Sequence, residues 1–391
     1  MATKAPPERN PLNIGVSGDA HFRDSQYARA SRGRDYFEAK MRMVDAAHAA
    51  GIQTLLDTGD FFNSSRPSAA VIQMATKLDR KLKKLGIAQL TITGNHDWST
   101  PTWLDVLFPD ADPADGGIIP MDDRRVVVDG FVYQGVRPYS PSGYRANEEA
   151  VKEMCAGADV VLMHATVNGI VESGVDPERM LDLTELPYVP GLKMIALGDL
   201  HFFGFITHRK VLVGYPGSTE MGSAAEPIQK VLPIVRLSDE SATIQDTIPL
   251  TIRPFFAATV RTEADADDLI AKLRPHVDSH PVVIAKFSRD IPSVLSRVYA
   301  LLDPQRAVIR FEPLPSKEDT STTRAAAADI EAHGIEYFLR ARFAEESKAN
   351  ELQLALDLLA RGESDAANIL AEYVERRKQE LAVRENTPTD S

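Results

Sequence analysis

The chain has 391 residues, of which 43% are hydrophobic and 26% are charged, and its formal net charge is −12. These values exclude a disordered, collagen-like or disulfide-framework class. Its single cysteine, Cys155, excludes an intrachain disulfide, and no run approaches the ~18 apolar residues of a membrane helix, so we expect a cytoplasmic protein without a membrane partner. Because the overall charge is acidic, a nucleic-acid partner would have to bind local basic patches.

Short apolar runs alternate with helical patterns over residues 1–250, which predicts a layered α/β fold. Helices are expected at 34–50, 68–85 and 147–157, from apolar residues at three- and four-residue spacing or from capping residues at the ends. Strands are expected at five β-branched or apolar runs, which are 14–17, 54–57, 90–93, 160–163 and 194–197.

The remainder of the chain predicts two further parts. Residues 251–315 follow the order strand, helix, strand, helix, strand, which is typical of a small α/β domain. Residues 316–324 are polar and predict a linker, and 325–391 are expected to form a helical tail. Two amphipathic stretches in this tail, 351–361 and 365–381, carry apolar stripes that two helices cannot fully bury. We expect the tail to bind a partner; the alternative is that it folds back onto its own domain.

Each of the five apolar runs is followed by potential metal ligands. The carboxyl ends of strands meet at one rim of an open α/β sheet, so these side chains are expected to lie together. Carboxylate, amide and imidazole ligands suit Mn²⁺, Fe or Zn²⁺ rather than Ca²⁺. Taken singly, a Gly-Asp pair is usually a turn and a Gly-Asn-His segment a loop; the joint pattern carries the inference. Its members are Asp19, His21, Asp60, Asn95, His96, Asp97, His164, Asp199 and His201.

This arrangement resembles the calcineurin-like metallophosphoesterase superfamily over residues 13–226. More narrowly, it resembles the SbcD nuclease family, the bacterial counterpart of the meiotic-recombination DNA-repair nuclease. Asp60 is followed by Phe61-Phe62, and Tyr215-Pro216-Gly217-Ser218 precedes Glu226, as in segments of that family. A small α/β unit and a helical tail also follow the nuclease domain there.

The resemblance implies a layered β-sandwich flanked by helices, with a small α/β capping domain. It also implies a Mn²⁺-dependent DNA exonuclease or endonuclease that works as a homodimer with an SbcC-like coiled-coil ATPase in DNA repair. Mg²⁺, Fe and Zn²⁺ stay open as the two ions. In this comparison one ion is held by Asp19, His21 and His201, the other by Asn95, His164 and Asp199, and Asp60 bridges them.

Two positions beside the ligands receive other roles from the resemblance. His96 would stabilise the transition state or protonate the leaving oxygen, and Asp97 would orient His96. The family usually has a histidine where this chain has Asp199. Aspartate remains a competent oxygen ligand, and the alternative that Asp199 is not a ligand stays open.

Basic residues follow the first ligand pair, and surfaces that contact phosphate have this composition. We expect Arg23, Arg29, Arg32 and Arg34 to contact substrate; the alternative is a solvated surface. Two other functions stay open. One is a stand-alone phosphodiesterase or phosphatase acting on a small phosphoester, and the other is a DNA-binding scaffold with an inactive site.

Overall fold

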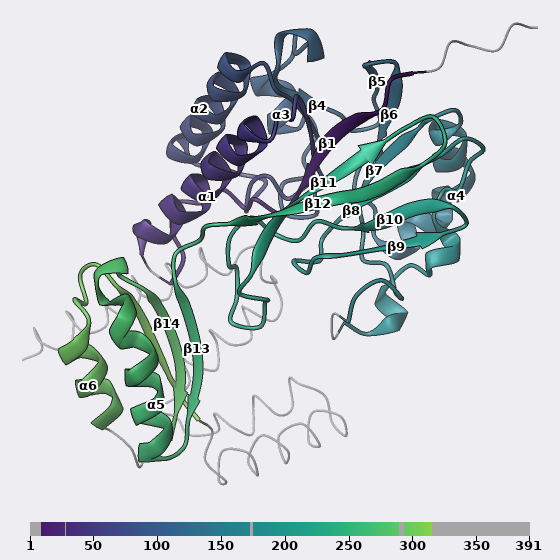
Figure 1. Cartoon of the computed structure of the whole chain (residues 1–391). Coiled ribbons are helices and arrows are strands. Elements are labelled where there is room, and N and C mark those ends of the chain that lie inside the picture. The colour runs from purple at the N-terminus through teal and green to yellow at the C-terminus, as the bar shows by residue number, and fades with distance from the viewer. Residues whose placement is uncertain (1–8, 28, 173–174, 289–292, 315–391) are drawn as a thin grey trace, which may run out of the picture. The chain divides into compact units, whose positions relative to one another are not determined.

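A computed structural model of the chain describes residues 9–27, 29–172, 175–288 and 293–314 (Figure 1). The expected linker at 316–324 and the helical tail at 325–391 lie outside the described residues. Within the described ranges, no helix combines the length and the apolar character needed to cross a membrane.

The first sheet has six strands. The four strands β1 to β4 are parallel, whereas β11 and β12 are antiparallel additions at one edge. Long connections that contain helices join the parallel strands, as parallel pairing requires. The spatial order is β12 (Ala242–Leu250), β11 (Lys230–Leu237), β1 (Leu12–Ser17), β2 (Thr54–Asp57), β3 (Ala88–Thr91) and β4 (Gly117–Pro120).

The second sheet also has six strands, with a parallel centre and one antiparallel strand at each edge. Two short 3₁₀ turns, Pro177–Arg179 and Leu183–Glu185, lie in the long connection between its two central strands. The spatial order is β5 (Arg125–Val128), β6 (Phe131–Gly135), β7 (Val160–His164), β8 (Met194–Gly198), β10 (Val211–Tyr215) and β9 (Gly204–His208).

The two sheets pack face to face. Successive residues of each strand point to opposite faces of their sheet, so one set of side chains fills the core between the sheets and the other set packs against helices. Leu56 of β2 and Leu162 of β7 lie in the core between the sheets. Leu55 instead packs beneath helices α1 (Ala30–Ala49) and α2 (Ala69–Leu85), and Val161 packs beneath helix α4 (Pro141–Cys155). Figure 1 shows α1 and α2 on one side of the strands and α4 on the other. The predicted layered sandwich with flanking helices is confirmed.

Helix boundaries follow their capping residues. The Ser68 side chain accepts a hydrogen bond from the Val71 N–H, and Gly86 ends the helix with a φ of 65°. Helix α4 begins at Pro141, six residues before the predicted start, because Ser140 caps it and proline suits the first helical turn. The short helix α3 (Trp103–Leu107) was not predicted, since five residues are too few to show a periodic pattern.

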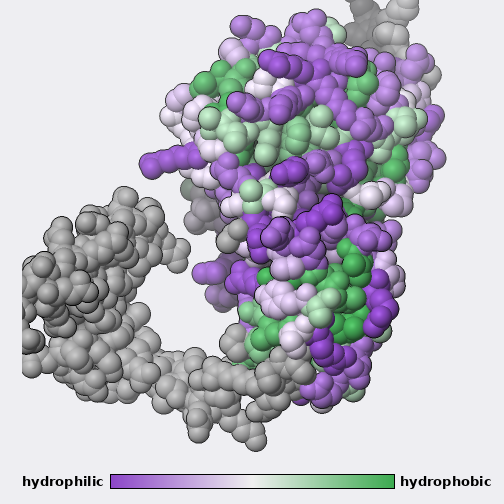
Figure 2. Space-filling view, turned by 90° about the vertical axis from the view of Figure 1, so that its left-hand side faces the viewer, coloured by the Kyte–Doolittle hydropathy of each residue, from purple (hydrophilic) through white to green (hydrophobic). Residues whose placement is uncertain are grey.

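A small three-stranded unit follows, with helices α5 (Glu263–Leu273) and α6 (Ser293–Leu301) between strands β13 (Phe255–Val260), β14 (Val282–Phe287) and β15 (Val308–Pro313). The strands lie in the order β13-β14-β15, and the unit has its own apolar core. Hydrophobic residues gather on its surface in Figure 2. A second apolar cluster joins Met221, from the loop after β10, to Phe255 and Val282 of this unit.

Candidate metal centre

The carboxyl ends of strands from both sheets supply the candidate ligands. Asp19 and His21 follow β1, Asp60 follows β2, His164 is the last residue of β7, and Asp199 follows β8. Four of these residues have left-handed backbone conformations, with φ of 50° at Asp19, 46° at His21, 49° at Asp60 and 94° at Asp199. Such conformations are costly for residues other than glycine, and they cluster at functional sites.

The loops after β1 and β2 hold each other in this shape. The Asp19 N–H donates to the Gly59 carbonyl at 2.9 Å, and the His21 N–H donates to the Asp60 carbonyl at 2.8 Å. Gly94, in the loop after β3, comes so close to Asp60 that an added Cβ would lie 2.1 Å from Oδ1. Only glycine fits there, which explains the Gly-Asn-His segment in physical terms.

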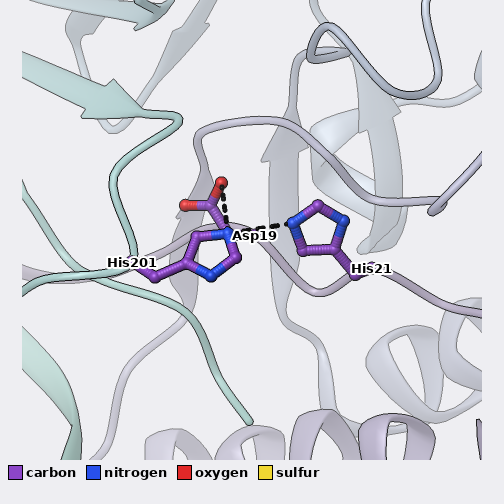
Figure 3. A group of neighbouring side chains, drawn as sticks. All are labelled: Asp19, His21 and His201. Atoms are coloured by element: carbon purple, nitrogen blue, oxygen red, sulfur yellow. Dashed lines mark hydrogen bonds and ion pairs between the residues drawn. The ribbon is translucent and has the colours of Figure 1, made fainter. Parts of the chain in front are cut away.

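Asp19, His21 and His201 form the first group (Figure 3). The two imidazole Nε2 atoms face each other at 3.0 Å, and His201 Nε2 lies 3.8 Å from Asp19 Oδ1. Two imidazole nitrogens at this distance repel unless a proton or a cation lies between them. The group therefore has the donor set and the spacing of a metal site.

Asp60 lies at the centre of the whole cluster. Its Oδ2 is 3.6 Å from His21 Nε2, 3.6 Å from His164 Nε2 and 4.0 Å from His96 Nε2. Asp60 accordingly belongs to two of the ligand groups, one with His21 and His96 and one with Asp19 and His164. A carboxylate in this position can contact two cations at once.

His164, Asn95 and Asp199 lie together on the other side of Asp60. His164 Nε2 is 3.7 Å from Asp199 Oδ1, and the Asn95 amide donates to the same oxygen at 3.4 Å. The Thr166 hydroxyl donates to the second oxygen of Asp199. Asp199, which stands where the family usually has a histidine, thus places a carboxylate within reach of His164.

The burial and the charges of the candidate ligands favour the binding of cations. Asp19 Oδ2 and His164 Nε2 are buried without a hydrogen-bond partner. Burial raises the pKa of Asp19 to about 6. Burial lowers the pKa of His164, but Asp60, Asp19 and Asp199 outweigh it and raise that pKa to about 9. Buried acids therefore compete for protons here, and divalent ions would replace those protons.

Neighbouring groups fix the orientation of two imidazoles. His164 Nδ1 lies 2.8 Å from the Thr58 carbonyl, so Nδ1 carries the proton and Nε2 faces the carboxylates. His201 Nδ1 lies 2.9 Å from Glu226 Oε1, and Lys230 donates to the other oxygen of Glu226 at 2.7 Å. The Glu226–Lys230 pair was missed as a functional element; its signal in the sequence is opposite charges four residues apart.

The structure gives Asp97 a different contact from the one expected. Its two oxygens accept the Phe62 N–H at 2.9 Å and the Gly94 N–H at 2.7 Å, so it fixes the loop backbone rather than the ring of His96. Burial, followed by the charge of Asp60, raises the Asp97 pKa to about 8. The His96 side chain is half-exposed, and its backbone N–H donates to Asp60 Oδ1 at 3.0 Å.

The four candidate arginines separate in space. Arg23 lines a hollow of about 470 Å³ at the metal centre, together with His21 and His201. Arg32 is fully buried and pairs with Glu220 at 3.3 Å, so the expectation that it contacts substrate is wrong. Arg29 is exposed and donates to the Pro304 carbonyl at 3.1 Å, and Arg34 is exposed.

A buried ion pair lies behind the site and was also missed. Lys40 of α1 and Asp57 of β2 are both fully buried and pair with each other, and Lys40 also donates to the Ser17 hydroxyl at 2.8 Å. A lysine on the apolar face of a helix is the signal that could have revealed it. The pair joins α1 to the two strands whose ends supply Asp19 and Asp60.

The family model described as "Calcineurin-like phosphoesterase" matches residues 12–203. This region contains the loops after β1, β2, β3, β7 and β8. Residues 12–203 form a calcineurin-like phosphoesterase domain.

Curated relatives of the phosphoesterase domain include two archaeal proteins named "DNA double-strand break repair protein Mre11". The protein of Methanosarcina acetivorans is 26% identical over 301 residues, which are 73% of this chain and 47% of that protein. The protein of Saccharolobus solfataricus is 24% identical over 262 residues, which are 64% of this chain and 67% of that protein. The chain thus spans about half the length of the first of these relatives.

Solved structures similar to this chain include a dimetal phosphatase from Danio rerio. It has a TM-score of 0.41 and 12% sequence identity, over 61% of this chain and 99% of that one.

Proposed function

We propose that this chain is a metal-dependent nuclease that hydrolyses DNA phosphodiester bonds with two divalent ions. The observation that supports the proposal is the position of Asp60, whose Oδ2 lies within 4.0 Å of three imidazoles at the meeting point of both sheets. Similarity to proteins named for DNA double-strand break repair supports DNA as the substrate.

In the proposed ligand sets, Asp60 would contribute a carboxylate to both ions. When bound, the two ions would lower the pKa of a water molecule and neutralise charge on the phosphate oxygens. We propose Mn²⁺, with Mg²⁺, Fe and Zn²⁺ as the alternatives that a metal titration separates. Asp19, His21 and His201 would hold one ion, and Asn95, His164 and Asp199 would hold the other.

His96 and Arg23 are the proposed substrate-directed groups. The half-exposed His96 imidazole can deliver a proton to the leaving oxygen or stabilise developing negative charge. Arg23 donates to the His21 carbonyl at 3.1 Å and stacks 4.3 Å from the centre of the Tyr36 ring. Its guanidinium is therefore held beside the ligands, where it can orient a phosphate.

A paired hydrolysis assay tests the proposal. Linear duplex DNA and bis-p-nitrophenyl phosphate are offered with increasing Mn²⁺, and the isosteric variant Asp60→Asn serves as the control. We expect Mn²⁺-dependent cleavage of the DNA, which Asp60→Asn abolishes. Hydrolysis of bis-p-nitrophenyl phosphate without cleavage of DNA would instead support a stand-alone phosphodiesterase. Activity on neither substrate would favour an inactive scaffold.

The expected partner-binding tail, residues 325–391, lies outside the described part of the chain. We propose that this tail binds an SbcC-like coiled-coil ATPase and that the nuclease forms a homodimer. The full chain should bind such an ATPase encoded beside it, and Leu356→Asp with Tyr373→Asp should abolish that binding. Size-exclusion chromatography with light scattering tests the dimer. Unchanged binding by the double variant would contradict the proposed tail contact.

A further inference from the structure

A second hollow lies beside the metal centre and differs in chemistry from the one that Arg23 lines. Its volume is about 440 Å³, within the range of roughly 300–1,000 Å³ typical of small-molecule pockets. Its lining residues include Asn95, His164 and Asp199, together with the aromatic residues Trp98 and Tyr139. The hollow therefore begins at the proposed ligands of the second ion.

The two aromatic residues come from different sheets. Trp98 lies in the loop after β3 of the first sheet, and Tyr139 lies in the loop after β6 of the second. Both side chains are half-buried, so each keeps some surface accessible to a ligand. The carboxyl ends of the two sheets thus bring a pair of aromatic rings to one hollow.

Contacts on the protein side hold these rings in place. The backbone N–H of Trp98 donates to the Gly94 carbonyl at 3.1 Å and fixes the loop that carries the ring. The Arg137 guanidinium lies 5.3 Å from the centre of the Trp98 indole and contacts the ring itself. Arg137 is itself paired with Asp123. Tyr139 packs against the apolar core beneath α4. Rings that are positioned in advance lose little conformational freedom when a flat ligand stacks on them.

The lining selects for an uncharged, flat group. Apart from the proposed ligands His164 and Asp199, none of the residues that line the hollow is charged. A phosphate held at the metal centre carries ester groups on both sides, and Asp199 lines both hollows. One substituent of the phosphate would therefore enter the aromatic hollow. In a nucleic acid the flat, uncharged part of that substituent is the base.

We propose that the hollow between Trp98 and Tyr139 binds a nucleobase next to the scissile phosphate. The inference rests on the proposed function. A base inside a duplex cannot reach such a hollow without leaving its stack, so the site takes an unpaired or extruded base. Frayed or single-stranded ends are therefore better substrates for this site than fully paired interiors.

Calorimetry with two small phosphates tests the site without relying on turnover. The full chain, loaded with Mn²⁺, is titrated with deoxyadenosine 5′-monophosphate and with deoxyribose 5-phosphate, which lacks the base. Stacking on aromatic side chains predicts that the nucleotide binds about 10- to 100-fold more tightly. Trp98→Leu should reduce this ratio to about 1, whereas Trp98→Phe, which keeps an aromatic ring, should preserve most of it.

The results separate this inference from the proposed function. Equal affinities for the two phosphates in the unaltered protein would overturn the base site, even if the protein cleaves DNA. A ratio that Trp98→Leu leaves unchanged would overturn the role of Trp98, and circular dichroism checks that this variant is folded. A base-dependent ratio that Trp98→Leu abolishes would support the base site. It would do so even in a protein that cleaves no DNA, where the proposed function alone fails.

Discussion

Glu226 allows a quantitative test of how the protein tunes one proposed ligand. Its carboxylate lies 2.9 Å from His201 Nδ1 and also accepts from Lys230. In Glu226→Gln the side chain keeps its shape but loses its charge. Hydrogen bonds to charged groups are worth roughly 1 kcal/mol more than neutral ones, so we expect Mn²⁺ affinity at one site to fall about 5-fold. Removing a group that hydrogen-bonds to a metal ligand can lower metal affinity by up to ~100-fold.

Isothermal titration calorimetry with Mn²⁺ measures this change. Glu220→Gln is the matched control, because Glu220 is also buried but pairs with Arg32, whereas Glu226 pairs with His201. The reasoning is refuted if Glu226→Gln binds both ions as tightly as the parent, or if Glu220→Gln weakens binding equally.

The same carboxylate predicts a dependence of stability on pH. Burial raises the pKa of Glu226, but His201 and Lys230 outweigh it and lower that pKa to about 2. The folded pKa is thus below its ordinary value of 4.5, so the stabilisation is complete above pH ~4.5. It is lost as the pH falls towards 2. Thermal unfolding from pH 6 to pH 2.5 should show a smaller loss of stability in Glu226→Gln than in the parent.

Further variants separate the roles of the remaining residues at and behind the site. Asp60→Ala should lose both ions, because its Oδ2 lies between the two ligand groups; two ions retained in calorimetry would refute the bridging role. His96→Ala should reduce turnover by ~10²–10⁴-fold while both ions still bind, and loss of an ion would make it a ligand. Asp199→His should stay active with altered Mn²⁺ preference, and unchanged metal binding in Asp199→Ala would remove it from the ligand set. Lys40→Met should lower the free energy of unfolding by about 3–5 kcal/mol, because it leaves Asp57 buried and unpaired. Urea unfolding measures this change. Adding Asp57→Leu to Lys40→Met should restore much of the lost stability.

The layers could be predicted from the sequence because their signals are local. Strand β7 alternates between two apolar cores, so Val161 and Leu162 are both buried and the run reads as a strand. Helix α2 shows its cap at Ser68 and its end at Gly86. The Ser-Pro signal at the start of α4 is equally local, and it indicates a helix that begins at Pro141.

Other features depend on contacts between distant segments and could not be predicted in this way. Arg32 carries the same charge as Arg23, and nothing nearby in sequence indicates that it forms a buried ion pair with the distant Glu220. Asp97 sits beside His96 in sequence, yet its oxygens accept backbone N–H groups of the loops. The contact between His164 and the Thr58 carbonyl involves a backbone group, which leaves no mark in residue type.

The left-handed backbone at Asp19, His21, Asp60 and Asp199 has an evolutionary consequence. Each such conformation costs on the order of 1–3 kcal/mol, so four together approach the ~5–15 kcal/mol of net stability that a domain possesses. A lineage that no longer used this site would gain stability by replacing these residues with glycine or asparagine. Degenerate descendants of this chain should therefore show those two residues first at the strand ends, and should be harder to unfold than their active ancestors.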